Sequence, residues 1–235
     1  RARRLSLEPF VEKPIVAGNL TYDQYRAIRF DPRRMLWAAE DDLAFQADFF
    51  HVGGLYKRGV DLFEVADGAA RPIAYDREMF DFGAEAEAVE EVAGPAFAGL
   101  RLHYPLNGLN MSEFAVFLGA SYFRAIGLDG RYGLSARGLA IRSGLHEEEF
   151  PRFEAFWLER PAPGDSHVTL HALLDSESVS GAFRFVLSPG ESTVMDVSAS
   201  LFPRREIEHL GLVTPQRPAA AGKPAAERDR KRAGW

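Results

Sequence analysis

The sequence predicts a mainly β protein built as an antiparallel β-sandwich, with less than a fifth of its residues in helices. About ten short segments are expected to be strands, because apolar and polar residues alternate along them. Turn residues such as Gly, Pro and Asn separate these segments at short intervals. The chain holds 21 Gly and 18 Phe among 235 residues, which suits many tight turns and a core of large apolar side chains.

Outside the middle of the chain, the elements follow from local patterns. Thr21 has a side chain suited to a helix cap, so a short helix is expected to continue to Ile28. Leu43–Val52 alternates, with its apolar residues on one face and Gln46 and Asp48 on the other. The other strands expected there are Tyr56–Val65, Ile73–Tyr75, Met79–Phe82, Phe97–Leu106, Val168–Leu174, Ala182–Leu187 and Thr193–Phe202.

The stretch Gly119–Pro161 has the most distinctive pattern. Two expected strands, Ser121–Ile126 and Tyr132–Ile141, flank the dipeptide Asp129-Gly130. This dipeptide is typical of a hairpin turn, because Gly adopts the positive φ that such turns need. A third strand is expected at Phe153–Arg160.

These three strands carry the candidate binding residues. Residues two apart on a strand share a face, so Tyr122 is expected beside Arg124, and Trp157 beside Glu159. Ser135 and Arg137 share a face for the same reason. Arginine, aromatic and hydroxyl groups on one sheet face suit a ligand with hydroxyls and flat apolar patches, such as a sugar. The candidate substrate-binding residues are Tyr122, Arg124, Tyr132, Arg137, Trp157, Glu159 and Arg160.

A purely structural interpretation of the same residues stays open. Arginine and glutamate often pair across neighbouring strands, and Tyr and Trp often lie at the rim of a sheet. In that case Arg124, Arg137 and Glu159 form a network that holds the strands in register and binds nothing.

Composition limits the function classes. The net charge is −6, which argues against nucleic-acid binding. No apolar run approaches the eighteen or so residues of a membrane span, so membrane insertion is not expected. The chain has no cysteine, which removes disulfides and thiolate metal sites. Residues 217–235 carry six Lys or Arg against two Asp or Glu, and residues 214–235 are expected to be a disordered basic tail.

Several longer motifs, in this order, resemble the periplasmic glucan biosynthesis proteins G and D. They are LTYDQYRAIRFD, LGASYFRAIG, YGLSARGLAI, EEFPRF with FW and ERP, and HALLDS with SGAFRFVLSPG. The resemblance extends from about Leu20 to Val213, which leaves residues 1–19 as an N-terminal arm and 20–213 as a partial sandwich domain. It implies a fold similar to the supersandwich of galactose mutarotases, here incomplete because this chain is interpreted as a truncated fragment.

The resemblance implies a periplasmic protein of osmoregulated β-1,2-glucan biosynthesis that binds β-glucan and, in its full-length form, trims it. The alternative is a carbohydrate-binding or scaffolding module that does not cleave its ligand. The expected partners are a β-glucan polysaccharide and, as a second possibility, the membrane glucan synthase machinery. No signal peptide is expected within the chain, since no apolar stretch follows Arg3-Arg4.

The sequence assigns no catalytic residue, metal or cofactor. The family resembles β-1,2-glucanases, but the resemblance places its general-acid Asp beyond the end of this chain. His167 and His171 have the spacing of a helical zinc pair, yet they lie in an expected strand, where they would be roughly 13 Å apart. The sequence therefore does not decide whether the chain is an enzyme.

Overall fold

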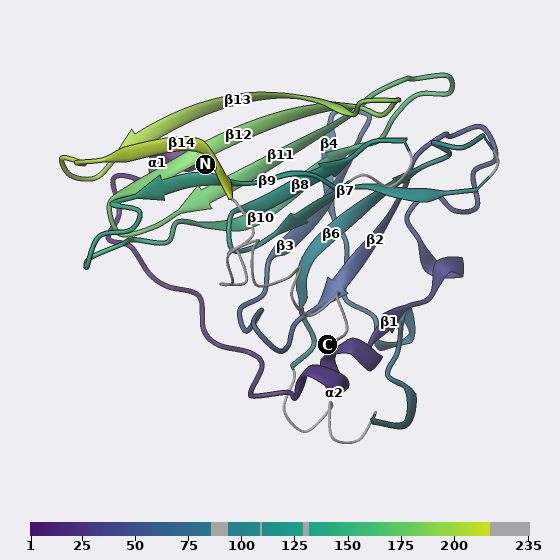
Figure 1. Ribbon diagram of the computed structural model, residues 1–235, viewed down its shortest axis with the longest axis horizontal. Coiled ribbons are helices and arrows are strands. Elements are labelled where there is room, and N and C mark those ends of the chain that lie inside the picture. The colour runs from purple at the N-terminus through teal and green to yellow at the C-terminus, as the bar shows by residue number, and fades with distance from the viewer. Residues whose placement is uncertain (86–93, 109, 129–131, 217–235) are drawn as a thin grey trace, which may run out of the picture.

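The computed structural model describes residues 1–85, 94–108, 110–128 and 132–216, which form two packed β-sheets (Figure 1). Strands occupy 47% of the chain and helices 10%, so the prediction of a mainly β sandwich is confirmed. Sheet I has the strand order β13-β12-β11-β10-β3-β4, and sheet II has the order β14-β9-β8-β7-β6-β2.

The strands of sheet I are β3 (Asp61–Ala66), β4 (Ala69–Pro72), β10 (Arg152–Glu159), β11 (Val168–Asp175), β12 (Val179–Ser188) and β13 (Val194–Pro203). Those of sheet II are β2 (Gln46–His51), β6 (Phe97–Tyr104), β7 (Ser112–Leu118), β8 (Tyr122–Ile126), β9 (Tyr132–Ile141) and β14 (Leu210–Gln216). All of these neighbours are antiparallel except β3 and β10, which pair in parallel, so sheet I is mixed. A two-stranded sheet joins β1 (Arg29–Phe30) to β5 (Phe80–Asp81).

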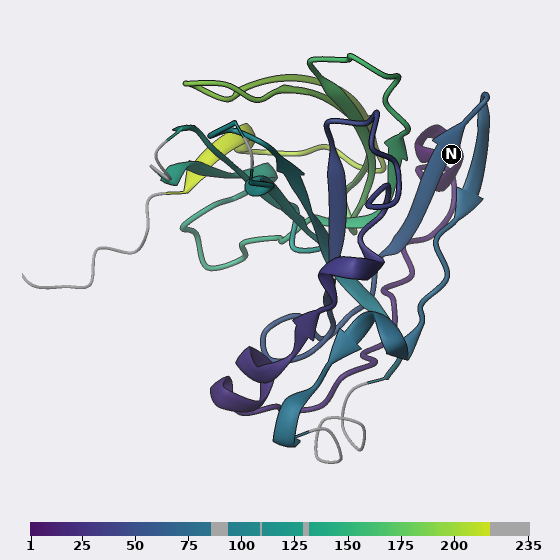
Figure 2. The same ribbon diagram turned by 90° about the vertical axis from the view of Figure 1, so that its right-hand side faces the viewer.

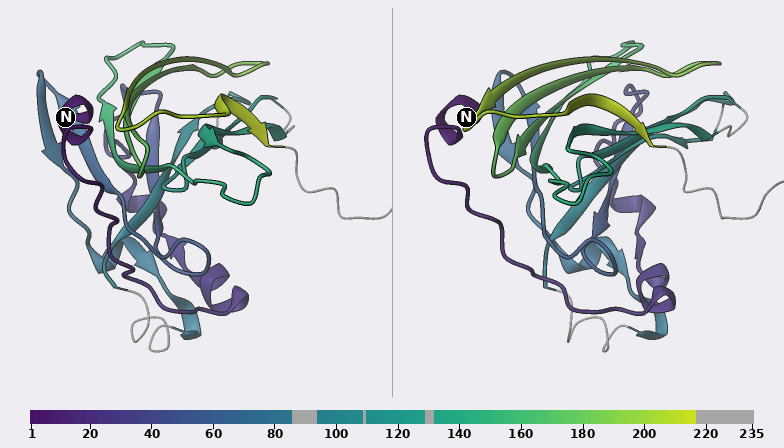
Figure 3. Two further views of the ribbon diagram at one scale, coloured as in Figure 1. Left: turned by 90° about the vertical axis from the view of Figure 1, so that its left-hand side faces the viewer. Right: turned by 60° about the vertical axis from the view of Figure 1, so that its left-hand side comes forward.

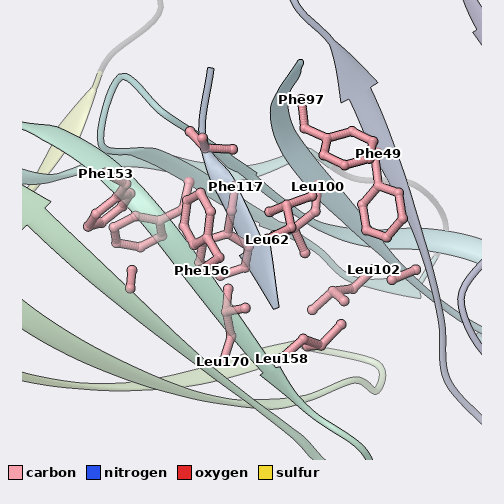
Figure 4. Close-up of a cluster of buried hydrophobic side chains, with 14 of the residues drawn as sticks. Phe49, Leu62, Phe97, Leu100, Leu102, Phe117, Phe153, Phe156, Leu158 and Leu170 are labelled. Carbon is pink, nitrogen blue, oxygen red and sulfur yellow. The ribbon is translucent and has the colours of Figure 1, made fainter. Parts of the chain in front are cut away.

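Phenylalanine side chains fill the space between the two sheets (Figure 4). Phe117 of sheet II meets Phe156 and Phe185 of sheet I edge to face, with ring centroids 6.1 and 4.9 Å apart. Such edge-to-face pairs stabilise a core beyond the apolar area that they bury. The alternation expected for β2 is confirmed, since Ala47 and Phe49 are buried in this core. The residue between them, Asp48, therefore points to the opposite face of sheet II.

The N-terminal arm connects opposite ends of the molecule (Figure 3). The first helix, α1 (Ala2–Leu5), packs against the outer face of sheet I. Arg204 donates hydrogen bonds to the carbonyl oxygens of Leu5 and Glu8, and Lys13 donates one to that of Glu154. These hydrogen bonds hold the arm to the rest of the chain at Leu5, Glu8 and Lys13. The arm ends near α2 (Tyr22–Ala27), which lies at the opposite end from β12 and β13 (Figure 2).

Local signals determine the short helices. Thr21 caps α2 as expected: its side chain accepts a hydrogen bond from the amide of Gln24, and the Gln24 side chain accepts one from the amide of Thr21. The 3-10 turns are η1 (Pro32–Arg34), η2 (Arg77–Met79) and η3 (Gly83–Glu85). None of the helices in the described part of the chain has the length and apolar character that a membrane span needs.

Several strands differ from the sequence-based expectation. Strands β1, β4, β7 and β14 were not expected, and the structure has no strand at Ile73–Tyr75. Strand β14 continues to Gln216 because it pairs with β9, so the ordered region extends beyond the expected boundary at Val213. The Asp129-Gly130 turn and residues 217–235 lie outside the described residues.

Candidate functional site

The register of β8 and β9 brings three of the seven candidate residues, together with Ser135, onto one face of sheet II. Tyr122 lies opposite Arg137, and Arg124 lies opposite Ser135. The intervening Phe123 is buried in the core, so the four polar side chains point away from it. The shared face expected from their spacing is present. We call this outer surface the polar face; its residues are Asp48, Arg101, Glu113, Tyr122, Arg124, Ser135 and Arg137.

Alternating acids and bases cross four strands of the polar face. Arg124 on β8 donates to Glu113 on β7 at 2.7 Å, and Arg101 on β6 lies 3.8 Å from the same carboxylate. Arg101 also donates to Asp48 on β2 at 2.6 Å. Asp48 is almost completely buried, with 2% of its surface exposed, and it bonds to His103 as well. The sequence analysis missed Arg101 because its partner Asp48 lies 53 residues away in the chain, and it missed Glu113 because strand β7 was not expected.

The other half of the polar face is held by hydroxyl and ion-pair contacts. The hydroxyls of Tyr122 and Ser135 lie 2.7 Å apart. Arg137 donates to Glu148 at 2.7 Å, and its guanidinium lies 5.3 Å from the ring centre of Phe150. The Gly144 amide and the Arg137 guanidinium hold the pKa of the Glu148 carboxyl below its ordinary value. The loop after β9 is thus tied down over one end of the polar face.

Aromatic rings accompany the arginines of the polar face. The guanidinium of Arg101 lies 4.9 Å from the ring centre of Phe50. Tyr25 and Tyr56 lie with their ring centres 6.0 Å apart, and Tyr56 is close enough to Tyr122 to interact with it electrostatically. Burial raises the pKa of the Tyr56 hydroxyl, so it stays a neutral hydrogen-bonding group. The sequence analysis missed both tyrosines: Tyr25 lies in a helix, and Tyr56 lies in an expected strand, Tyr56–Val65, which in the structure begins only at Asp61.

The other three candidate residues belong to sheet I. Trp157 stacks on Phe63 with ring centres 5.1 Å apart, in a small apolar cluster with Ala2 of α1. Glu159 lies 2.5 Å from the Nε2 of His171. Arg160 forms ion pairs with Glu40 and Glu64. Because Trp157 and Glu159 lie on the outer face of sheet I, the structure does not bring all seven candidate residues onto one sheet face.

Tyr132 can be placed only by its backbone. It is the first residue of β9 and pairs with Ile126 of β8. Its strand therefore contributes to sheet II.

Two hollows adjoin the polar face, one at each end. The hollow beside β2, which we call the arginine hollow, has a volume of about 860 Å³ and shares Asp48 and Arg101 with the polar face. The hollow at the other end has a volume of about 680 Å³ and includes Glu148 and Phe150, which contact Arg137. The two hollows therefore lie next to opposite ends of the row of strands from β2 to β9.

This arrangement provides planar donors, carboxylate acceptors and aromatic rings, which together suit a ligand rich in hydroxyl groups. Among the described residues, no group of three or more His, Asp and Glu has the geometry to hold a metal ion. We assign no catalytic role to any residue of the polar face.

Comparisons with known proteins agree with the motifs. The family model described as "Periplasmic glucan biosynthesis protein, MdoG" matches residues 1–216, a region that begins earlier than the expected Leu20. The chain is 50% identical over 217 residues to a glucans biosynthesis protein G of Rhodopseudomonas palustris, covering 90% of this chain and 43% of that protein. A protein of the same name from Vibrio cholerae is 45% identical over 217 residues, with 90% and 40% covered.

The chain thus spans less than half the length of these curated relatives. The match nevertheless covers nearly all of the residues that the structure describes. The chain belongs to the family of periplasmic glucan biosynthesis proteins.

Proposed function

We propose that this chain binds a β-1,2-linked glucan along the polar face, in the periplasm, as part of osmoregulated glucan biosynthesis. The observation that carries the proposal is the array of Asp48, Arg101, Glu113 and Arg124 across four strands. Membership of the glucan biosynthesis family supports the choice of a glucan as the ligand.

The chemistry of the polar face supports sugar binding. Arg124 and Arg137 each keep a planar guanidinium with several N–H donors, of which a carboxylate uses only part. Tyr122, which is only partly buried, offers a ring that suits the C–H surface of a pyranose. The ion pairs fix the arginines before the ligand arrives, which lowers the entropy cost of binding.

Cleavage is proposed only for the whole protein. A glycosidase needs one carboxyl group as acid and another as base or nucleophile on either side of the bond. The carboxylates of the polar face are bound to arginines: Asp48 to Arg101, and Glu113 to Arg124. In this chain these carboxylates therefore position the guanidinium groups. We assign trimming of the glucan to the longer protein.

The alternative is a binding or scaffolding module that acts in glucan synthesis without cleavage. One observation favours it: the arm exposes two large apolar side chains, Leu7 and Val11, to more than 80%. Contact with another protein would remove both side chains from water. The membrane glucan synthase machinery is the partner that this alternative requires.

Calorimetric titration with a linear β-1,2-glucan oligosaccharide tests the proposal, with a β-1,4-linked oligosaccharide of equal length as the control ligand. We expect saturable heat for the β-1,2 ligand and at least tenfold weaker binding of the control, since the two chains space their hydroxyls differently. Absence of binding of the β-1,2 ligand would refute the proposal. Analysis of the products after prolonged incubation separates cleavage from binding alone.

A further inference from the structure

The arginine hollow is lined by two arginine side chains that form no ion pair with the described residues. Arg26 stands in the last turn of α2 and Arg29 in β1, and both line the hollow. Both side chains are exposed, and neither has a hydrogen bond or ion pair with any described residue. The floor of the hollow includes Phe30 and Phe80, which are buried.

Each of the four carboxylates that line the hollow already accepts a hydrogen bond, two of them from arginines that also line it. Asp31 accepts hydrogen bonds from Arg33, whose guanidinium holds the pKa of Asp31 below its ordinary value. Asp48 is bound by Arg101. The remaining two are also occupied, because Glu78 accepts from Arg34 at 2.8 Å and Asp81 accepts from the amide of Gly83 at 2.8 Å.

Arg29 and Asp81 are cross-strand partners in the small sheet, yet they form no ion pair. The Asp81 carboxylate turns instead to the amide of Gly83. The N–H groups of the Arg29 guanidinium can therefore donate hydrogen bonds to a group that enters the hollow. Arg26 lies three residues earlier in the chain and adds a second planar donor to the same space.

We propose that the arginine hollow binds an acidic group, a carboxylate or phosphate, carried by the saccharide that lies on the polar face. The inference rests on the proposed function and adds a charged substituent to the substrate class. The hollow and the polar face are continuous, since both include Asp48 and Arg101. Tyr25 of α2 interacts electrostatically with Arg101, while the next residue, Arg26, lines the hollow, so one helix contributes to both surfaces.

The geometry explains why two arginines are needed. A carboxylate or phosphate has two or more acceptor oxygens and takes hydrogen bonds best from planar guanidinium groups. Because Arg26 and Arg29 are exposed to solvent, the gain in affinity is modest and falls as salt is added.

The test compares a neutral β-1,2-glucan oligosaccharide with the same oligosaccharide carrying carboxymethyl groups, by calorimetry at low salt. We expect the wild-type chain to bind the carboxymethylated form about tenfold more tightly. The double variant Arg26→Gln with Arg29→Gln is expected to lose this preference and to keep its affinity for the neutral form. Raising the NaCl concentration to about 0.3 M is expected to reduce the preference of the wild-type chain.

Arg184→Gln is the matched control, because Arg184 is also exposed and has no hydrogen bond or ion pair with the described residues, but it lies on β12 of sheet I. This variant removes one positive charge and should keep the full preference. A preference that survives in the double variant, or that disappears equally in Arg184→Gln, would overturn the proposal. Failure of the neutral oligosaccharide to bind the wild-type chain would instead count against the proposed function.

Discussion

The Nη2 of Arg124 lies 2.7 Å from the Oε1 of Glu113, and this contact joins β8 to β7 on the outside of the sandwich. Both side chains are mostly shielded from solvent, with 28% and 23% of their surfaces exposed. Arg101 approaches the same carboxylate from β6, so Glu113 is shared by two arginines. Removing Glu113 therefore leaves two guanidinium groups with less compensation for their charge.

We expect Glu113→Gln to lower the free energy of unfolding by about 1–2 kcal/mol, because a partly shielded ion pair is broken on one side. A double-mutant cycle with Arg124→Gln should give a coupling energy of about 1 kcal/mol in urea unfolding. The control is the exposed pair Arg34–Glu78, whose coupling should stay below about 0.5 kcal/mol. Equal coupling in the two pairs would contradict this account of the polar face.

Glu148 predicts a dependence of stability on pH. Its folded-state pKa lies below its ordinary value of 4.5, so the native state holds fewer protons than the unfolded state. The stability that Glu148 contributes is thus fully present above about pH 4.5 and is lost as the pH falls through the lowered pKa.

Urea unfolding of the wild-type chain and of Glu148→Gln between pH 7 and pH 3 measures this effect. The difference between the two should be largest near neutral pH and should shrink in acid. Glu191→Gln is the control, since the Glu191 side chain is exposed and has no partner among the described residues. A gap between wild type and Glu148→Gln that stays constant down to pH 3 would refute the assignment.

Trp157 is expected to support the fold and to have no role on the polar face. It stacks on Phe63 and lies beneath Arg1, with the guanidinium 5.8 Å from its ring centre. Trp157→Ala should lower the free energy of unfolding by about 2 kcal/mol, less than for a fully buried Trp, because the ring is only partly buried. Glucan affinity should stay within twofold of wild type. A larger loss of affinity would indicate that Trp157 belongs to the glucan-binding site.

Gly99 is expected to be intolerant of any side chain. A Cβ at this position of β6 would lie 2.1 Å from the carbonyl oxygen of Phe117 on the neighbouring strand. Backbone cannot move aside as a flexible side chain does, so Gly99→Ala should cost about 3 kcal/mol. Gly190→Ala is the control, because its Cβ would meet only the carbonyl oxygen of Ser192 at an ordinary 3.6 Å. Similar melting temperatures for the two variants would contradict this prediction.

Local alternation predicted individual strands and the faces of their residues. The period of two placed Tyr122 with Arg124 and Ser135 with Arg137, and the structure has both pairs on one face. Alternation does not reveal which sheet a strand joins. Strand β10 follows β9 in the chain but pairs with β11 and β3 in the other sheet, which separates Trp157 from Arg124.

The partners of the site arginines could not be predicted for a related reason. Asp48 and Arg101 are 53 residues apart, and their contact depends on the register of β2 against β6. Strand β7, which supplies Glu113, was not expected at all, so the ion pair with Arg124 had no basis in the sequence analysis. Tyr25 reaches the site from a short helix, and Tyr56 reaches it from a loop that alternation had assigned to the expected strand Tyr56–Val65.

The most direct test of the polar face as the glucan site makes the same substitution on each sheet. Arg124→Lys and Arg160→Lys both keep the positive charge and remove the planar fork. In calorimetric titration with a linear β-1,2-glucan oligosaccharide, Arg124→Lys should bind about tenfold more weakly, and Arg160→Lys should match the wild-type chain within twofold. Equal affinities for the two variants, with a lower melting temperature for Arg124→Lys alone, would show that Arg124 is a structural residue and would contradict the account.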